Sequence, residues 1–535
     1  MKQKKTTLLS VNHLSVAFTT SAGGEKTVVD RISFSLKEGE ILGIAGESGS
    51  GKSMTALAVM GLLPESARRR CESIVFDGVQ LCGDAAMSGE QAKTEREKKK
   101  KEEQLRQELS GSKMTMIFQE PLTSLNPVLT IKKQMEEPLL LHAKLSPEER
   151  EEAIVSALTK AELKNAKRLL HQYPHELSGG MRQRVMIAMA MVNKPRLLIC
   201  DEPTTALDAV TEREIVALIR KLAKEQGTAV IFISHDLSVL RSLCDRVMIM
   251  KDGRVVEEGT TEQIFECPEE AYTKNLMKAA VKGAKEAEET GITEEVVLSA
   301  EKVSVVFRRS NGLFRAPELK QAVSEVSFFV KQGEIFGIVG ESGCGKSTLL
   351  KAVAGLLTHY EGQINRRDGK IGVQMVFQDP YTSLNPAKKV GWILEEPLRL
   401  NTELTKEERL IRVREILAET ELPEDAIGRK VSELSGGQRQ RVAIAAALIT
   451  KPELVLLDEP VSALDVTVQA QILELLLRLQ KEHGLTYVFV SHDMAVVRKI
   501  CDRVMVMKDG RVVECGETEE LFQNPKEGYT KKLLG

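Results

Sequence analysis

The chain has 535 residues, of which 28% are charged, and a formal net charge of −2 at pH 7. This length predicts two domains, because single hydrophobic cores stop growing at about 250–300 residues, and the balanced charge argues against a global nucleic-acid-binding surface. No apolar run approaches the ~18–20 residues that a membrane span needs, and the N-terminal segment lacks the apolar core of a signal peptide. The eight cysteines show no C-x-x-C spacing, which favours a reducing cytoplasm over a disulfide framework.

The first predicted elements are two strands, over residues 8–18 and 28–36, where apolar residues alternate. A short apolar strand then leads into the loop Gly46–Ser53 (GESGSGKS) and an apolar helix. This order of strand, G-x-x-x-x-G-K-S and helix is what a phosphate-binding loop requires. Its glycines let backbone N–H groups surround phosphate oxygens, while Lys52 adds a positive charge and the Ser53 hydroxyl can ligate Mg²⁺. The sequence therefore predicts a nucleotide site.

A second loop of the same kind, GESGCGKS, in the C-terminal half shows that the chain is an internal repeat. The copies differ in length, because Lys52 and Lys346 are 294 residues apart whereas Gln119 and Gln378 are 259 apart. Most of the 35 extra residues of copy one fall at about 84–112, a charged, helix-favouring segment without an apolar stripe. We expect a solvated surface helix or a disordered arm there, with a partner-docking arm as the alternative. Nucleic-acid binding fits less well, because Glu nearly balances Lys and no aromatics interleave.

Each copy next has an apolar strand that ends in glutamine, at Gln119 and Gln378, followed by a turn and Ser-Leu-Asn-Pro. An uncharged side chain at a strand end could reach a metal ion and a nucleophilic water. Leu125 and Leu384 are apolar residues within otherwise polar loops. We therefore expect both leucines at a surface loop that a docked partner would contact. Helices with Ser or Thr caps and Glu three residues on follow in both copies.

The longest repeated stretch organises both halves of the chain. Leu177–Pro203 and Leu434–Pro460 align without a gap, and 17 of the 27 positions are identical. Each stretch begins with Ser-Gly-Gly, which would point backbone N–H groups at an anion near a helix N-terminus. Each ends in an apolar strand followed by Asp-Glu-Pro. Two adjacent carboxylates at the end of a buried strand are costly unless a metal ion or a reacting group uses them.

Beyond each carboxylate pair, Ala-Leu-Asp places Asp208 and Asp465 before a helix, and a further apolar strand ends in Ser-His-Asp. His235 and His492 thus follow strands whose carboxyl ends meet the phosphate loops, where open α/β sheets bind ligands. Their matched position in the two copies favours contact with a γ-phosphate over a structural role. Each copy closes with a Lys-Asp-Gly hairpin and a Tyr-Thr segment, and a small, charged, turn-rich linker at 279–294 joins them.

These motifs resemble those of the ATP-binding cassette (ABC) family over nearly the whole of both copies. The glycine-rich loops are similar to its Walker A motif, the strand-end glutamines to its Q-loop, Leu-Ser-Gly-Gly to its signature, and Asp-Glu to its Walker B pair. Gln-Glu/Asp-Pro-x-x-Ser-Leu-Asn-Pro and the closing Tyr-Thr more narrowly resemble ATPase subunits of peptide, nickel and glutathione importers. In those subunits the closing motif usually reads His-Pro-Tyr-Thr, whereas here it reads Glu-Ala-Tyr-Thr and Glu-Gly-Tyr-Thr.

The resemblance implies an α/β fold of two tandem P-loop ABC ATPase domains, at 1–278 and 295–535. Each domain would have a mixed RecA-like core, an antiparallel β subdomain and a helical signature subdomain. The Walker B glutamates would polarise the attacking water, and the Walker A lysines and switch histidines would hold the γ-phosphate. These implied catalytic residues are Glu202, Glu459, Lys52, Lys346, His235 and His492. The residues implied to support Mg²⁺ are Ser53, Gln119, Asp201, Ser347, Gln378 and Asp458.

The resemblance also implies the residues that bind the nucleotide. In the two Walker A loops they are Gly46, Glu47, Ser48, Gly49, Ser50, Gly51, Lys52 and Ser53, and Gly340, Glu341, Ser342, Gly343, Cys344, Gly345, Lys346 and Ser347. The aromatics that fit the adenine-stacking position are Phe18 and Phe307. The signature and D-loop residues are Ser178, Gly179, Gly180, Ser435, Gly436, Gly437, Asp208 and Asp465. In this family the domains pair head to tail, so each Walker A loop would face the signature of the other domain, and ATP binding would close them.

The importer resemblance implies an ATPase that powers uptake of a small solute, with peptides favoured and nickel or glutathione also possible. Its implied partners are two integral-membrane permeases and an extracytoplasmic substrate-binding protein, all separate chains, which would hold this protein at the cytoplasmic face of the membrane; no nucleic-acid partner is expected. The competing interpretation is a soluble tandem ATPase that acts on ribosomes or nucleic acid. Such proteins usually carry a long charged helical linker between the cassettes, whereas here the linker is short and the charged arm lies inside copy one.

Overall fold

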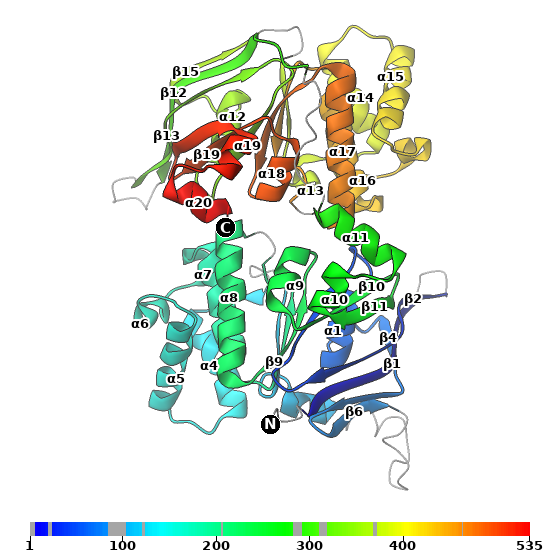
Figure 1. Ribbon diagram of the computed structural model, residues 1–535, viewed down its shortest axis with the longest axis vertical. Helices are drawn as coiled ribbons and strands as arrows, with labels where there is room; N and C mark the ends of the chain where they lie inside the picture. The colour runs from blue at the N-terminus through cyan, green and yellow to red at the C-terminus, as the bar shows by residue number, and fades with distance from the viewer. Residues whose placement is uncertain are drawn as a thin grey trace. The chain divides into compact units, whose positions relative to one another are not determined.

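The computed structural model describes residues 6–19, 24–83, 103–119, 124–204, 207–281, 291–309, 318–367, 372–462 and 464–534. The chain divides into two compact units. Unit one comprises Met1–Leu207 and Thr211–Ala280, and unit two comprises Asp208–Val210 and Val281–Gly535. Each unit contains an antiparallel sheet, a mixed sheet and helices (Figure 1), which confirms the predicted α/β class. Within the described residues, no helix is long and apolar enough to cross a membrane.

The antiparallel sheet of unit one follows from the alternation of apolar residues near the N-terminus. Its order is β2-β1-β5-β6, with β4 also paired to β1. The strands are β1 Thr7–Thr19, β2 Glu25–Lys37, β4 Ala67–Arg70, β5 Ser73–Phe76 and β6 Val79–Gly83. In β1, Leu9 and Val11 are buried, and Leu14 and Val16 are buried after a register shift. His13, whose φ is 48°, lies at this register shift. The shift bends the strand, so the apolar side chains before and after it face the same core.

The mixed sheet of unit one has the order β11-β10-β3-β9-β8-β7. Its strands are β3 Ile41–Ala45, β7 Met114–Ile117, β8 Leu197–Asp201, β9 Ala229–Ile233, β10 Arg246–Lys251 and β11 Arg254–Thr260. All neighbours pair in parallel except β10 and β11, which form the predicted hairpin. Every residue of β3, β8 and β9 is buried, as expected for parallel strands covered on both faces.

The helices of unit one fall into those that cover the mixed sheet and a group that carries the signature motif. They are α1 Lys52–Met60, α4 Ile131–His142, α5 Pro147–Lys160, α6 Ala166–Leu169, η2 Pro174–Glu176, α7 Gly179–Met191, α8 Ala209–Gln226, α9 Leu237–Leu243, α10 Thr261–Glu266 and α11 Ala271–Val281. Helices α4, α5 and α7 contact one another, and Met135, Leu158 and Val185 belong to their shared core. This helical group lies on the side of the unit away from the antiparallel sheet (Figure 1).

Unit two repeats this plan. Its antiparallel sheet has the order β13-β12-β15, and its mixed sheet has the order β16-β17-β18-β14-β19-β20. The strands are β12 Val296–Arg309, β13 Glu318–Lys331, β14 Ile335–Val339, β15 Glu361–Arg366, β16 Val373–Val376, β17 Leu454–Asp458, β18 Thr486–Ser491, β19 Arg503–Lys508 and β20 Arg511–Glu517. The helices are α12 Lys346–Val353, α13 Pro380–Ser383, α14 Val390–Asn401, α15 Lys406–Glu419, η3 Glu424–Gly428, η4 Val431–Glu433, α16 Gly436–Leu448, α17 Val466–His483, α18 Met494–Ile500, α19 Thr518–Gln523 and α20 Gly528–Leu534.

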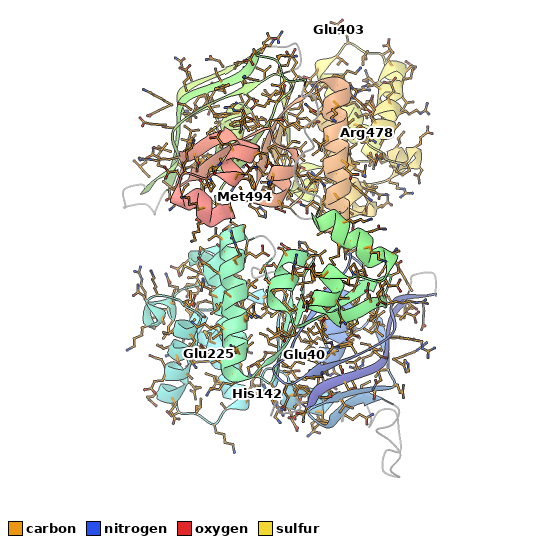
Figure 2. The ribbon with its side chains drawn as sticks, in the orientation of Figure 1. Glu40, His142, Glu225, Glu403, Arg478 and Met494 are labelled. Carbon is orange, nitrogen blue, oxygen red and sulfur yellow. The ribbon has the colours of Figure 1, made fainter. Side chains whose placement is uncertain are left out.

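A buried ion pair fixes the start of the central strand in each unit. Just before β3, Glu40 (labelled in Figure 2) accepts a 2.8 Å hydrogen bond from Nη1 of Arg246. Just before β14, Glu334 accepts one of 3.0 Å from Arg503. The Glu334 side chain is only 1% exposed, and its burial raises the pKa of its carboxyl even though Arg503 and the Lys331 amide oppose the shift. Such a pair is costly to break, because the remaining charge would be buried without a partner.

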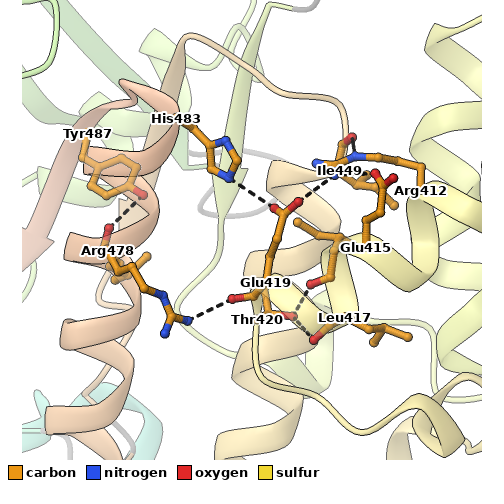
Figure 3. Close-up of polar contacts among 11 residues, drawn as sticks. Arg412, Glu415, Leu417, Glu419, Thr420, Ile449, Arg478, His483 and Tyr487 are labelled. Atoms are coloured by element: carbon orange, nitrogen blue, oxygen red, sulfur yellow. Dashed lines mark hydrogen bonds and ion pairs between the residues drawn. The ribbon is translucent and has the colours of Figure 1, made fainter.

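A second set of ion pairs joins the signature-bearing helices to the rest of each unit. In unit two, Glu421 accepts 2.7 Å hydrogen bonds from Arg441 on α16 and Arg478 on α17, and the Arg478 bond lowers the pKa of Glu421. A chain of contacts in the same unit also runs from Arg412 on α15 to Glu419 (2.8 Å), and from Glu419 to His483 at the end of α17 (3.2 Å; Figure 3). These partly exposed pairs set orientation more than stability, because solvent screens them.

The charged segment of copy one lies partly outside the described residues, namely at 84–102. The residues that follow are helical from 103 to 109, and this helix is fixed to unit one on one side. Arg106 donates a hydrogen bond to the carbonyl of Gly61, Leu109 packs against the core beneath the antiparallel sheet, and Asn193 donates a 2.8 Å bond to the carbonyl of Gly111. The end of the segment is therefore a surface helix with specific tertiary contacts.

Both ends of the predicted linker at 279–294 take part in local structure. Helix α11 continues to Val281. At the other end, the Thr293 amide donates a 3.1 Å bond to the carbonyl of Gln332, whose own amide donates a 2.8 Å bond to the carbonyl of Glu295. Only residues 282–290 lie outside the described part of the linker.

We predict that the segment 282–290 acts only as a tether, which raises the effective concentration of one unit near the other. A protease site inserted there and cleaved should leave the melting temperatures of both units unchanged and preserve, at high protein concentration, the ATPase activity that the resemblance implies. The matched control is Thr293→Pro, which removes the amide donor to Gln332. It should lower the melting temperature of unit two by about 2–4 °C if about 1 kcal/mol is lost. Activity that stays absent at saturating concentrations of both folded halves would show that the segment does more than tether.

Candidate active sites

The two phosphate loops have backbone conformations that other residues would not adopt. Gly46 and Gly340 have φ values of 146° and 152°, and a Cβ on them would lie 2.1 Å from the carbonyl oxygen of Met250 and 2.2 Å from that of Met507. Glycine is therefore required at the first position of each loop. A Cβ on Gly49, farther along the loop, would meet no atom within 4 Å. The loop is thus anchored to the hairpin strand at its start and open to a ligand at its tip, as a phosphate cradle must be.

The loop lysines are buried and point at the start of their own loops. Lys52 is 6% exposed and Lys346 is 4% exposed. The ammonium of Lys52 donates 2.8 Å bonds to the carbonyls of Gly46 and Glu47, and that of Lys346 donates bonds of 2.8 and 3.0 Å to the corresponding carbonyls of unit two. These bonds satisfy a buried charge and hold it at the phosphate loop, where it can stabilise an anion.

The serine that follows each lysine contacts the Walker B aspartate. Ser53 donates a 2.9 Å bond to Oδ1 of Asp201, and Ser347 donates one of 2.9 Å to Asp458. Burial raises the pKa of both aspartates, and the serine hydroxyl only partly opposes this. Among the described residues, no group of three or more His, Cys, Asp or Glu side chains could hold a metal ion. One hydroxyl and one carboxylate nevertheless fit Mg²⁺, which is usually held by one or two protein ligands together with substrate phosphates.

The Walker B glutamates lie at the centre of a second polar cluster, which the structure brings together in both units. In unit two, Oε2 of Glu459 accepts a 3.0 Å bond from Nε2 of Gln378 and lies 3.0 Å from Nδ1 of His492. In unit one the corresponding distances, from Glu202 to Gln119 and to His235, are 2.9 and 3.2 Å. Three motifs that are distant in the sequence therefore converge on one carboxylate.

The backbone of these glutamates is in the left-handed region, which the sequence motifs do not predict. Glu202 has φ 46° and Glu459 has φ 47°. Each amide donates a 3.0 Å bond to the neighbouring strand, at Ile233 and Val490. A non-glycine residue in this conformation costs about 1–3 kcal/mol and is typical of functional sites. The conformation turns the glutamate out of the buried strand and toward the glutamine and histidine.

In unit two the glutamate and histidine of the cluster stabilise one another in their charged forms, and in unit one the glutamate raises the pKa of the histidine. Burial alone would lower the pKa of His235 and His492, but the hydrogen bond and negative charge of the adjacent glutamate outweigh it and raise the pKa of each imidazole. Burial would likewise raise the pKa of Glu459, yet the hydrogen bond and charge of His492 bring the pKa below its ordinary value. Glu459 therefore stays an anion that can accept a hydrogen bond from water, as a general base requires.

The signature serines contact their own helices. Ser178 accepts a 3.3 Å bond from the Met181 amide at the start of α7, and Ser435 accepts one of 3.3 Å from the Gln438 amide at the start of α16. The second signature glycine is required for packing, because a Cβ on Gly437 would lie 2.6 Å from Val468 on α17. Gly180 packs against α8 in the same way, whereas a Cβ on Gly179 would meet no atom within 4 Å. The open backbone at the helix N-terminus suits an anion.

The remaining predicted nucleotide residues occupy loop or sheet positions. Asp465 caps α17 by accepting a 3.0 Å bond from the Val468 amide, and Asp208 is buried. Phe307 on β12 is 44% exposed, and Phe18 on β1 is half-buried. Both aromatic side chains thus retain open surface, which adenine stacking would need.

The expectation that Leu125 and Leu384 lie at the surface is wrong. They are 1% and 6% exposed and belong to the cores of the signature-bearing helices. In unit one the loop folds back because the side chain of Gln134 on α4 accepts a 2.8 Å bond from the Asn126 amide and donates a 3.1 Å bond to the Asn126 carbonyl. Among the described residues near these loops, Val128, at 76%, and Tyr381, at 59%, expose the most apolar surface.

Comparison with known families identifies the class of these sites. The ABC transporter model matches residues 29–205 and 323–462, and the model of the oligopeptide/dipeptide transporter C-terminal region matches residues 256–304 and 513–535. The chain belongs to the ABC transporter family. The two Walker A loops and Walker B pairs lie within the first match, so this ABC protein is an ATPase with an ATP-binding domain in each half.

Several curated relatives are similar over nearly their full length. The peptidoglycan transport ATP-binding protein YejF of Agrobacterium fabrum is 41% identical over 551 residues, covering 100% of this chain and 97% of that protein. The glutathione import ATP-binding protein GsiA of Escherichia coli K12 is 41% identical over 568 residues, covering 98% and 89%. Among solved structures, the archaeal ribosome recycling factor aABCE1 in complex with stalk protein aP1 superposes with a TM-score of 0.60 over 95% of this chain and 91% of that chain. At 24% identity, this last similarity shows the fold alone.

The raised pKa of His492 predicts a pH-dependent contribution to the stability of unit two. A histidine whose pKa is raised on folding contributes stability that is fully present below its unfolded pKa of about 6.5 and is lost as the pH rises through the folded pKa. The melting temperature of His492→Asn should therefore fall furthest below that of the unchanged protein near pH 6, and the gap should shrink toward pH 9. Calorimetry across this range measures it. The control is His359→Asn at an exposed histidine, and a gap for His492→Asn that grows with pH would contradict the assignment.

Proposed function

We propose that this ABC ATPase is the motor subunit of an importer and couples ATP hydrolysis to uptake of a small solute. The observation that carries the proposal is similarity over nearly the whole chain to ATP-binding proteins of peptidoglycan transport and glutathione import, together with the oligopeptide/dipeptide transporter C-terminal region in both halves. Those relatives favour a peptide-like cargo, including glutathione. The similarity in fold to a ribosome recycling factor adds no observation that favours a ribosomal role.

We further propose that ATP binds at two composite sites, each completed by the signature motif of the other copy. Lys52, Asp201, Glu202 and His235 would face Ser435 and Gly437, and the corresponding residues of copy two would face Ser178 and Gly180. Each half-site then binds ATP in a closed form only with the other domain, so ATP binding drives closure and the products favour opening. This arrangement rests on membership of the ABC family and on the presence of every motif in both copies.

In the proposed chemistry, the Walker A lysine and the switch histidine stabilise the γ-phosphate, and the Walker B glutamate orients the attacking water and accepts its proton. Mg²⁺, held by Ser53 and Asp201 or by Ser347 and Asp458 with Gln119 or Gln378 nearby, would neutralise phosphate charge when bound. The contact between the glutamine and the glutamate means that a change at the Q-loop reaches the general base directly.

We propose that the partners are two membrane-embedded permeases and an extracytoplasmic substrate-binding protein, all separate chains, and that the ATPase sits on the cytoplasmic face of the membrane. Support comes from the import function named for the relatives and from the lack of a helix able to span a membrane within the described residues. Exposed apolar residues beside the Q-loops offer a docking surface in place of the buried leucines.

The central test removes the proposed general base. The double variant Glu202→Gln, Glu459→Gln should keep ATP binding but lose about 10²-fold or more in ATP turnover, the scale of a lost general base. Steady-state phosphate release and equilibrium ATP binding measure the two effects separately. The matched control changes Glu225 and Glu482, exposed glutamates on α8 and α17, to glutamine and should leave turnover unchanged. Near-normal hydrolysis in the first variant would falsify the assignment.

The docking proposal makes a prediction about membrane recruitment. Val128→Ser and Tyr381→Ser should weaken co-sedimentation with membranes that contain the permeases and uncouple transport, while basal ATPase stays largely intact, because both side chains are exposed. Leu319→Ser is the matched control, since Leu319 is 63% exposed on the antiparallel sheet of unit two. The importer proposal is wrong if the protein ignores the permeases and instead co-sediments with ribosomes in an ATP-dependent manner.

A further inference from the structure

The Tyr-Thr segment that closes copy two reaches the phosphate loop. The hydroxyl of Tyr529, on the C-terminal helix α20, accepts a 3.1 Å hydrogen bond from the amide of Glu341. Glu341 is the second residue of the loop that begins at Gly340, and the two partners are 188 residues apart in the sequence. The C-terminal helix therefore contacts the backbone of the ATP site.

Contacts on the other side of the same residue show why this hydrogen bond matters. The Glu341 carbonyl accepts a 3.0 Å bond from the ammonium of Lys346 and a 3.3 Å bond from the Cys344 amide. Tyr529 holds the amide that precedes this carbonyl, so the residue is fixed from both ends. Rotation of the backbone at Glu341 would move the carbonyl with which Lys346 is paired, and with it the charge that faces the phosphates.

Tyr529 is itself held rigidly. Lys508, at the end of β19, places its ammonium 4.9 Å from the centre of the tyrosine ring. The turn before α20 is fixed by Glu514 on β20, whose carboxylate accepts bonds of 2.9 and 3.2 Å from the amides of Lys526 and Glu527. The ring packs against the core of unit two. Burial raises the pKa of Tyr529, so the hydroxyl stays neutral at physiological pH.

We propose that Tyr529 is a positioning residue for ATP at the site of unit two, and that its hydroxyl sets the affinity of this site by fixing the Glu341 peptide. The inference rests on the proposed function only in requiring that the loop binds ATP. It assigns a role to the closing Tyr-Thr motif of copy two and makes the C-terminal helix part of the ATP site. Tyr529 does not touch the reacting atoms in this proposal and acts through the loop backbone.

The variant Tyr529→Phe tests the hydroxyl alone, because phenylalanine keeps the ring that packs on the core and faces Lys508. The full-length chain would carry Lys52→Ala, which weakens the site of unit one, and binding of a fluorescent ATP analogue with Mg²⁺ would be measured at equilibrium. We expect Kd to rise by about threefold to tenfold, the range for one hydrogen bond, with a fall in melting temperature of no more than about 2–4 °C, the size expected for one lost hydrogen bond in a unit of this length. In a Lys346→Ala background, Tyr529→Phe should change the remaining binding by less than about twofold, since that binding is mainly at the site of unit one, whereas the Tyr529 hydroxyl contacts the loop of unit two. Tyr360→Phe, at a partly exposed tyrosine elsewhere in unit two, is the matched control in both backgrounds.

Two results would overturn the proposal. An unchanged Kd for Tyr529→Phe in the Lys52→Ala chain would show that the hydroxyl does not set affinity. A loss of binding that appears equally in both lysine backgrounds, or that accompanies a fall in melting temperature larger than about 2–4 °C, would show a general structural role. Failure of the ATP assignment is distinguishable, because the Lys52→Ala chain with Tyr529 intact would then bind no nucleotide. The measurement needs no permease, so it is independent of the importer proposal.

Discussion

The candidate active sites depend on carboxylates at the ends of buried parallel strands. Asp201 and Asp458 end strands in which every residue is buried, and burial raises the pKa of both side chains. An ionised carboxylate in that position is unfavourable unless a cation or hydrogen-bond donors compensate. The rest of each site supplies those partners, beginning with the serine of the phosphate loop. The same place suits the proposed Mg²⁺ beside a bound nucleotide, because a cation would offset the cost of the buried charge.

The same constraint explains the neighbouring glutamates. A residue after the buried aspartate must leave the strand, and the left-handed conformation of Glu202 and Glu459 accomplishes this within one residue. The glutamate side chains then reach the glutamine that follows β7 or β16 and the histidine that follows β9 or β18. Because these strands lie on either side of the Walker B strand, their ends meet beside one carboxylate. The order of strands in the sheet therefore determines which motifs cooperate.

Much of this arrangement could be predicted from the sequence, because its motifs combine a buried apolar strand with a polar residue at its end. The pattern predicts both the strand and the edge of the sheet where the side chain lies. The burial of Leu125 and Leu384 could not be predicted in this way, because it depends on loops that fold back onto helices, in unit one through Gln134. The left-handed glutamates depend on hydrogen bonds to another strand, and the contact of Tyr529 with Glu341 depends on the fold of the C-terminal helix.

The two copies also differ within the phosphate loop, at Ser50 and Cys344. Among the described residues, Ser50 Oγ is a buried polar atom without a hydrogen-bond partner, which is costly in a closed interior. Cys344 occupies the same place, and burial raises the pKa of its thiol, so it stays neutral and makes weaker demands for a partner. A phosphate oxygen could satisfy the serine of unit one, whereas the thiol of unit two would gain little from such a contact. Two sites with the same motifs can therefore differ in how much ATP stabilises each loop. In unit two, the hydrogen bond between the Glu341 amide and the Tyr529 hydroxyl holds the loop independently of the ligand.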